Sequence, residues 1–297
     1  MKFYYFMLPL IASAIVSCEE DKDKFSGQDI IEFRDPNFLK ALLVVKETDL
    51  GNPDNDEVTI PYLINVDANR DGQISVNEAK VVKGLEIDYE FEIREMPEIK
   101  YFTSLISLRC YNDRLYSLDV SANKSLRYLY LSCHGKKRSS CKMVTVGNNT
   151  ELQYLNIDDT LIESFDLSGC ANLEYLICTD NYNLKTLDIG KKTALKHIRL
   201  RSNSTETLDL SGCINLESLY CAQNNIKALD ISKNNKLKYL WLSDRDNSVE
   251  TLDLSGCAEL KEIVLLCEQI QKIILNVNNK YPSAFIDQYK DIIEYVK

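Results

Sequence analysis

Residues 216–236 read LESLYCAQNNIKALDISKNNK, and this phrase recurs along the chain with leucines at constant offsets. Its template is L-x-x-L-x-(L/C)-x-x-N-x-(I/L)-x-x-L-D-(L/I)-S. The steps between copies are 21, 26, 21, 22, 21, 21 and 23 residues, and the copies begin at Leu105, Leu126, Leu152, Leu173, Leu195, Leu216, Leu237 and Leu260. A nearly fixed period of this length predicts a solenoid, in which each repeat buries its leucines against its neighbours.

Both halves of each repeat predict short strands. The pattern L-x-x-L-x-L places its last two apolar residues two apart, so that they share one face of a strand. The second half, for example Leu208-Asp209-Leu210, has the same alternation. We therefore expect two parallel β ladders around a leucine core, built from about eight repeats of 21–23 residues.

The repeated phrase resembles bacterial leucine-rich repeat proteins, specifically the short type with Leu-Asp-Leu-Ser in the second half of each repeat. The resemblance covers about 170 residues and implies the leucine-rich repeat solenoid fold. It says little about the ligand, because leucine-rich repeats bind many unrelated molecules.

The solenoid divides the chain into five expected parts. These are a lipoprotein signal peptide at 1–17, an acidic tether at 18–24, a small helical N-terminal cap domain at 25–100, the solenoid at 101–277 and a C-terminal helical cap at 278–297. Residues 37–47 and 76–85 predict helices in the N-terminal cap domain. In the C-terminal cap, Ser283 is a possible N-cap, and the apolar residues recur at helical spacing: Tyr281, Phe285, Ile286, Tyr289, Ile292, Ile293 and Val296. An exposed amphipathic partner helix is the alternative for this segment.

The first residues predict export and anchoring. Residues 3–16 are an apolar run too short to span a bilayer comfortably. Residues 15–18, IVSC, resemble a bacterial lipobox, which implies that Cys18 is lipidated and becomes the mature N-terminus. Residues 19–21, EED, resemble the acidic signal that sends some Gram-negative lipoproteins to the outer face of the outer membrane. We expect a surface-exposed lipoprotein that meets the membrane through its anchor only; an ordinary signal peptide followed by a solvated tether is the alternative.

Residues 67–78, DANRDGQISVNE, contain the sharpest chemical motif of the chain. The pattern D-x-N-x-D-G-x-I-x-x-x-E is that of an EF-hand-type calcium loop, with a closing bidentate glutamate. The predicted ligands are Asp67, Asn69, Asp71, Gln73 through its carbonyl, Ser75 through water, and Glu78. A polar turn with a capping box is the alternative. The family resemblance extends to this loop, which often precedes the first repeat, and we expect Ca²⁺ as a structural cofactor.

Charge and composition exclude several classes of function. The formal net charge is −10 and the pI is about 4.9, which disfavours nucleic acid and anionic lipid as partners. The two histidines are His134 and His197, and the chain has no nucleophile elbow, Walker loop, zinc-protease helix or dinucleotide fingerprint. We therefore expect no enzymatic activity.

The ten cysteines suggest one disulfide at most. Cys133 and Cys141 flank HGKKRSS in the longest repeat, and we predict that this pair is bridged. Cys110, Cys178 and Cys221 replace core leucines, and Cys170, Cys213 and Cys257 lie in turns two ladder steps apart, which is too far for a disulfide. A metal site that combines His134 with both thiols is the alternative.

The repeated Leu-Asp phrase aligns aspartates in a column. Carboxylates one ladder step apart would repel by about 0.9 kcal/mol even in water, so we expect hydrogen bonds to the backbone of the following turn. A row of cation sites is the alternative. The aspartates are Asp119, Asp166, Asp188, Asp209, Asp230 and Asp253.

Aromatic side chains gather on the outward side of the first strand. Two neighbouring columns hold the single tryptophan and six of the 17 tyrosines, and their candidate binding residues are Tyr128, Tyr130, Tyr154, Tyr175, His197, Arg199, Tyr220, Tyr239 and Trp241. Binding surfaces are enriched in such residues, although cross-strand pairing alone could also explain them. We expect a macromolecular partner, with protein as the leading class and glycan as the second. A purely structural envelope protein is the third possibility.

Overall fold

The computed structural model describes residues 29–44, 65–112, 114–134, 140–243 and 248–297. Cys18, the expected signal peptide and the expected acidic tether lie outside the described residues. Within these ranges, no helix combines the length and the apolar character that a membrane crossing requires.

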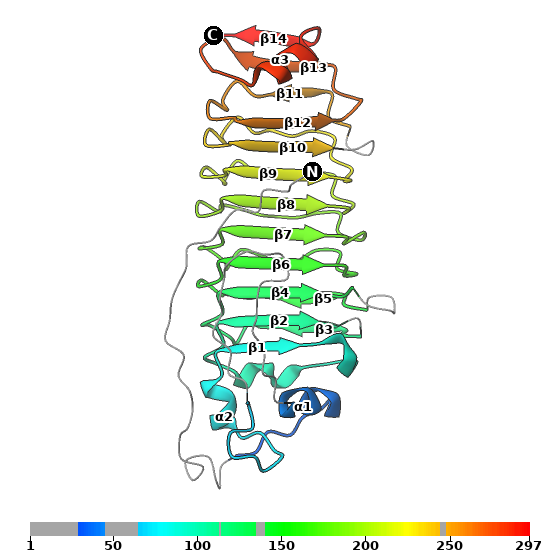
Figure 1. Cartoon of the computed structure of the whole chain (residues 1–297), viewed down its shortest axis with the longest axis vertical. Helices are drawn as coiled ribbons and strands as arrows, with labels where there is room; N and C mark the ends of the chain where they lie inside the picture. Colours follow the sequence, from blue (N-terminus) through cyan, green and yellow to red (C-terminus); the bar gives the residue numbers. More distant parts are fainter. Residues whose placement is uncertain (1–28, 45–64, 113, 135–139, 244–247) are drawn as a thin grey trace.

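Nine parallel strands form one long sheet, here called the large sheet, that runs along the solenoid between its two caps (Figure 1). The order along this sheet follows the chain, as expected when every repeat adds one rung. Its strands are β1 (Gly84–Ile87), β2 (Ser107–Tyr111), β4 (Tyr128–Ser132), β6 (Tyr154–Asp158), β7 (Tyr175–Thr179), β8 (His197–Arg201), β9 (Ser218–Ala222), β10 (Tyr239–Ser243) and β12 (Glu262–Leu266). The solenoid predicted from the repeat is confirmed.

The second ladder is shorter than the sequence predicts. In the part of the chain that the structure describes, it forms true strands only toward the two ends of the solenoid, where β3 pairs with β5, and β13 pairs with β11 and β14. Between them, single bridges join Thr186 to Thr207 and Thr207 to Ala228. The strand bounds are β3 (Ser117–Asp119), β5 (Met143–Thr145), β11 (Thr251–Asp253), β13 (Lys272–Asn276) and β14 (Ile293–Val296).

Hydrogen bonds of the aspartate column explain why these strands are short. Asp209 Oδ1 accepts a 2.9 Å hydrogen bond from the backbone N–H of Ser211, two residues on, and this turns the chain out of the extended conformation. Four other aspartates of the column make the same contact: Asp119, Asp166, Asp230 and Asp253. The structural interpretation of the column is therefore confirmed for these five positions.

The N-terminal cap is only partly helical within residues 29–44 and 65–100, and residues 45–47 of the first expected helix lie outside the described residues. Its helices are α1 (Pro36–Leu43) and α2 (Val76–Val81), followed by the 3₁₀ turns η2 (Tyr89–Phe91) and η3 (Pro97–Tyr101). Asp35 begins α1 by accepting a 2.9 Å hydrogen bond from the N–H of Asn37. The second helix ends before the predicted residue 85, because β1 pairs with β2 and joins the large sheet. The solenoid thus begins inside the segment assigned to the cap domain.

The C-terminal cap is a helix followed by a strand. Helix α3 (Ser283–Tyr289) buries Phe285, and β14 then adds in parallel to β13. The expected helix is therefore wrong beyond α3, where Ile293 and Val296 are extended. The Tyr289 hydroxyl donates to the carbonyl of Leu265, so the cap is fastened to the last rung of the large sheet.

Asparagines of the repeated phrase are buried beside the leucine core. The side-chain amides of Asn181, Asn203 and Asn224 each donate to a backbone carbonyl of an earlier rung, at 3.0, 3.0 and 3.1 Å. These bonds give the buried side-chain amides their partners and join successive rungs. The asparagine of the template is therefore a structural requirement as well as a turn residue.

Candidate binding face and loop sites

The large sheet aligns the predicted binding residues in two adjacent columns, which we call the binding face. In the first column, register pairs join Tyr128 to Tyr154, Tyr154 to Tyr175 and Tyr175 to His197. The second column holds Tyr130. Further along it, Arg199 pairs with Tyr220, and Tyr220 pairs with Trp241. All nine residues, with Tyr239 in the first column, are partly exposed, and they alternate with buried leucines, isoleucines and cysteines.

Rings of the binding face pack against one another along the columns. Tyr175 lies between Tyr154, at a centroid distance of 6.0 Å, and His197, at 4.5 Å with ring planes 20° from parallel. In the second column, the Arg199 guanidinium lies 5.3 Å from the Tyr220 ring centroid, and Tyr220 meets Trp241 edge to face at 5.3 Å. The ring faces thus contact neighbouring side chains, which restricts their rotamers.

Trp241 lies on the surface as the alternation predicts. Its side chain is half-buried, and Nε1 donates a 3.1 Å hydrogen bond to Glu262 Oε1 on the next rung. The neighbouring Leu240 is completely buried. The two sides of β10 are therefore chemically distinct, which makes this strand a suitable place to separate binding from stability.

A column of alternating charge borders the binding face and was not predicted from the sequence. Lys196 Nζ lies 2.7 Å from Glu174 Oε2, and Lys238 Nζ lies 2.8 Å from Glu217 Oε2. These four residues precede the strands β7, β8, β9 and β10 by one position. The signal was the residue after the first leucine of each repeat, which reads Glu, Lys, Glu and Lys in successive copies. A hollow of about 370 Å³ lies among Glu174, Lys196 and Glu217.

Burial disfavours the charged forms of the two stacked side chains of the first column, Tyr175 and His197. Desolvation lowers the pKa of His197 to about 4, although the nearby carboxylates of Glu217 and Glu174 oppose the shift. Desolvation also raises the pKa of Tyr175 to about 12. At neutral pH this part of the binding face therefore presents uncharged rings beside the charged column.

The predicted calcium ligands occupy a loop that is tightly hydrogen-bonded. Asp67 accepts from the N–H groups of Asp71 and Gly72 at 3.1 and 2.9 Å, and Asp71 accepts from Gln73 at 2.8 Å. The Asn69 amide donates to Asp71 Oδ2 at 2.9 Å. Gly72 has a φ of 81°, a conformation that favours glycine at the sharp turn of the loop.

Glu78, the expected closing ligand, serves as a capping residue in this structure. Its Oε2 accepts from the N–H of Ser75, and the Ser75 hydroxyl accepts from the N–H of Glu78, completing a capping box. Its Oε1 accepts from the N–H groups of Ala68 and Asn69 at 2.9 and 3.3 Å. Glu78 therefore reaches the start of the loop, and bidentate binding to an ion would require it to exchange these partners.

The predicted disulfide is not formed. Cys133 and Cys141 are both buried and are not bridged. The two thiols are hydrogen-bonded to each other. This hydrogen bond lowers the pKa of the Cys141 thiol in spite of its burial. The parts of the alternative metal site are not brought together, since the His134 ring lies against carboxylates of the neighbouring rungs rather than the thiols.

Comparisons with known proteins support the fold. No protein-family model and no curated protein matches the chain. Among solved structures, it is similar to the functional domain of InlJ from Listeria monocytogenes, with a TM-score of 0.50 and 21% identity over 82% of this chain. The match covers 55% of that protein, so the chain spans about half of its length.

Two further internalins of Listeria monocytogenes are also similar. InlF matches with a TM-score of 0.35 and 16% identity, over 89% of this chain and 91% of its own. InlC2 matches with a TM-score of 0.40 and 15% identity, over 89% of this chain and 94% of its own. With the strand order and the InlJ match together, the fold is that of a leucine-rich repeat solenoid.

Proposed function

We propose that this protein is a surface lipoprotein that binds another protein through the binding face. The observation that carries the proposal is the register of the large sheet, which aligns nine partly exposed aromatic and basic residues in two adjacent columns. Tyrosine, tryptophan and arginine are the residues most enriched at the energetic centres of protein interfaces. Their mutual packing fixes the rings before binding and lowers the entropic cost of association.

The way the rings pack favours a protein over a glycan. Sugar recognition on aromatic residues uses exposed ring faces, but here the faces of Tyr175 and His197 cover each other and Arg199 lies over Tyr220. The side chains therefore offer edges, hydroxyl groups and one bordering row of charges. These groups suit the mixed polar and apolar surface of a protein partner.

We further propose that a lipid anchors the protein and that a calcium ion stabilises its N-terminal cap. Lipid on Cys18 would tether the chain to the outer membrane, with the solenoid exposed at the cell surface. A calcium ion in the loop of residues 67–78 would stabilise the N-terminal cap and have no role in chemistry. Asp67, Asn69 and Asp71 would hold it, since their oxygens already share one short loop.

A capture experiment with matched variants tests the binding face. The full-length protein is crosslinked to the surface proteins of intact host or bacterial cells. It is compared with the variants Trp241→Ala and Tyr220→Ala and with the control Tyr116→Ala. Tyr116 is 57% exposed and lies outside both columns. We expect capture of the same partner by the wild type and the control, and at least about a tenfold loss with the two face variants.

Two outcomes would contradict the proposal. Equal capture by all four proteins would place the interface elsewhere. Specific binding on a glycan array that depends on Trp241, without a crosslinked protein, would assign the same face to a sugar ligand.

A further inference from the structure

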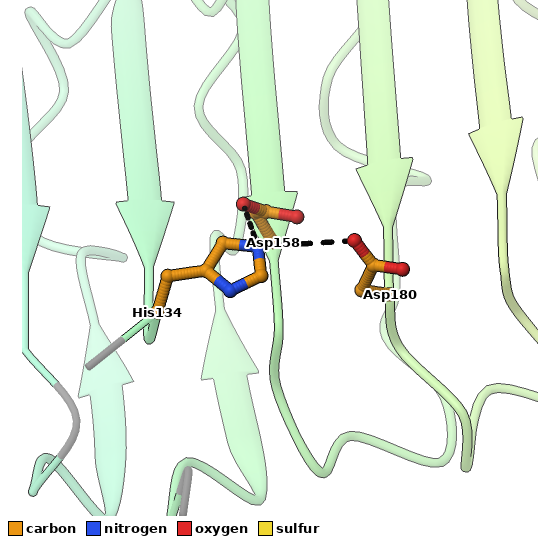
Figure 2. Close-up of side chains that lie close together, drawn as sticks. All are labelled: His134, Asp158 and Asp180. Carbon is orange, nitrogen blue, oxygen red and sulfur yellow. Dashed lines mark ion pairs between the residues drawn. The ribbon is translucent and has the colours of Figure 1, made fainter. Parts of the chain in front are cut away.

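Three neighbouring rungs of the large sheet bring His134, Asp158 and Asp180 together (Figure 2). His134 follows β4, Asp158 is the last residue of β6, and Asp180 follows β7 directly. Because β4, β6 and β7 are adjacent parallel strands, their carboxyl ends meet at one edge of the sheet. Asp159 follows Asp158 at the same edge.

The spacing of the side-chain atoms is that of ligands around a small metal ion. His134 Nε2 lies 2.9 Å from Asp158 Oδ2 and 3.8 Å from Asp180 Oδ2. One ligand atom from each of the three residues lies within 4.8 Å of the other two. Tetrahedral ligands at zinc bond lengths of about 2.0–2.1 Å are separated by roughly 3.3 Å, which lies between the two observed distances.

Neighbouring hydroxyl groups orient both carboxylates. Asp158 is 8% exposed, its Oδ1 accepts from the Thr179 hydroxyl, and its Oδ2 accepts from the Ser132 hydroxyl at 3.4 Å. The Tyr182 hydroxyl donates to Asp180 Oδ1 at 3.2 Å, on the oxygen that His134 does not contact. Outer partners of this kind fix the ligands of metal sites and tune their affinity.

The cluster carries more negative charge than its histidine can balance. Asp158 and Asp180 face Nε2, and Asp159 Oδ2 lies 3.2 Å from Nδ1. Even a protonated imidazole supplies one positive charge against three carboxylates. A divalent cation between the carboxylates would remove this repulsion, which is costly for a buried group such as Asp158.

We propose that His134, Asp158 and Asp180 bind one divalent transition-metal ion of the zinc type. One imidazole nitrogen with two carboxylate oxygens is a ligand set that zinc accepts, whereas calcium takes oxygen ligands only. The His134 side chain is 55% exposed, so solvent reaches the cluster and a water molecule would complete four ligands. The ion connects three successive rungs and fixes the residue at which the longest repeat leaves the large sheet.

Zinc titration of the full-length protein tests this site. The chelator-treated protein is titrated calorimetrically with zinc chloride in excess calcium, so that the loop of residues 67–78 does not compete. We expect one zinc ion per chain. His134→Gln and Asp180→Asn should each lower the affinity by at least about tenfold. The control Asp209→Asn removes a carboxylate of the aspartate column and should bind zinc as the wild type does.

Cobalt(II) identifies the ligands. Cobalt in the proposed site should show visible ligand-field bands without a thiolate charge-transfer band, and Cys133→Ser should leave the spectrum unchanged. Absence of zinc binding by the wild type would overturn the proposal and leave a histidine–carboxylate ion pair only. Equal affinities in all variants, or loss of binding with Cys133→Ser, would overturn it as well.

Discussion

Tyr175 and His197 stack with their ring centroids 4.5 Å apart and their planes 20° from parallel. This contact buries the imidazole, and desolvation lowers its pKa from the ordinary value of 6.5 to about 4. The folded state therefore disfavours protonation of the His197 imidazole. In the unfolded chain the same imidazole is protonated at its ordinary pKa. The consequence is a dependence of stability on pH that can be measured.

Stability should fall as the pH is lowered from about 6.5 to about 4. In that window the unfolded chain binds more protons at His197 than the folded chain does, so acid favours unfolding. The groups facing the imidazole are Glu174, Lys196, Glu217 and Lys238. After allowance for partial exposure, the loss is on the order of 1–2 kcal/mol.

Urea unfolding at pH 6.5 and pH 4.5 checks this prediction. His197→Phe keeps an aromatic ring but removes the titrating nitrogen, so it should lose less stability on acidification than the wild type. Parallel losses in the two proteins would show that other groups cause the acid sensitivity.

Substitutions at two adjacent residues of β10 should differ strongly in their cost to stability. Leu240→Ala removes a completely buried side chain and should cost about 2–5 kcal/mol of unfolding free energy. Trp241→Ala, on the other side of the strand, should cost about 1 kcal/mol or less through lost cross-strand packing. Denaturant melts of both variants measure the difference. A large loss of stability with Trp241→Ala would make this residue a core element and remove it from the binding face.

Calcium should stabilise the N-terminal cap. At a concentration of 100 times Kd, a single site adds about 2.7 kcal/mol to the stability of the folded state, or roughly 5–10 °C in melting temperature. Asp71→Ala should remove the difference between melts in calcium and in chelator, whereas Asp209→Asn should keep it. Identical wild-type melts, with no ion bound at saturating calcium, would show that residues 67–78 are a capped polar turn.

Cys18→Ser should release the protein from membranes. The physical reason is that acyl chains on Cys18 would supply the apolar surface that holds the protein in the bilayer. Fractionation of producing cells and mass spectrometry of the mature N-terminus measure the effect. An unmodified wild-type N-terminus at any other residue would contradict lipidation.

The sequence predicts the columns of the binding face because the side-chain period of a strand is two and every repeat adds one rung. The positions of Tyr128, Tyr175 and Trp241 follow from their offsets to the core leucines alone. Two strands could not be found in this way. Strand β1, with the sequence GLEI, lacks the leucine phrase, and the apolar residues of β14 fit a helix and an edge strand equally well.

The cluster around His134 was missed for a different reason. His134 lies in the one repeat that is 26 residues long, where the template assigns no column to it. Its contacts with Asp158 and Asp159 depend on where the chain goes after β4, and a repeat pattern does not contain this information. The closeness of Cys133 and Cys141 was predictable from spacing, but their bonding state depends on sulfur geometry.

The longest repeat also shows where the chain tolerates change in length. Tyr128 and Tyr154 are 26 positions apart, yet they pair in the same register as Tyr154 and Tyr175, which are 21 apart. The five additional residues therefore leave the rungs undisturbed, as expected when a doubling of loop length costs only about 0.6 kcal/mol. An epitope tag or a protease site inserted among residues 135–139 should leave the solenoid folded, which makes this position an entry point for engineering and for evolutionary diversification.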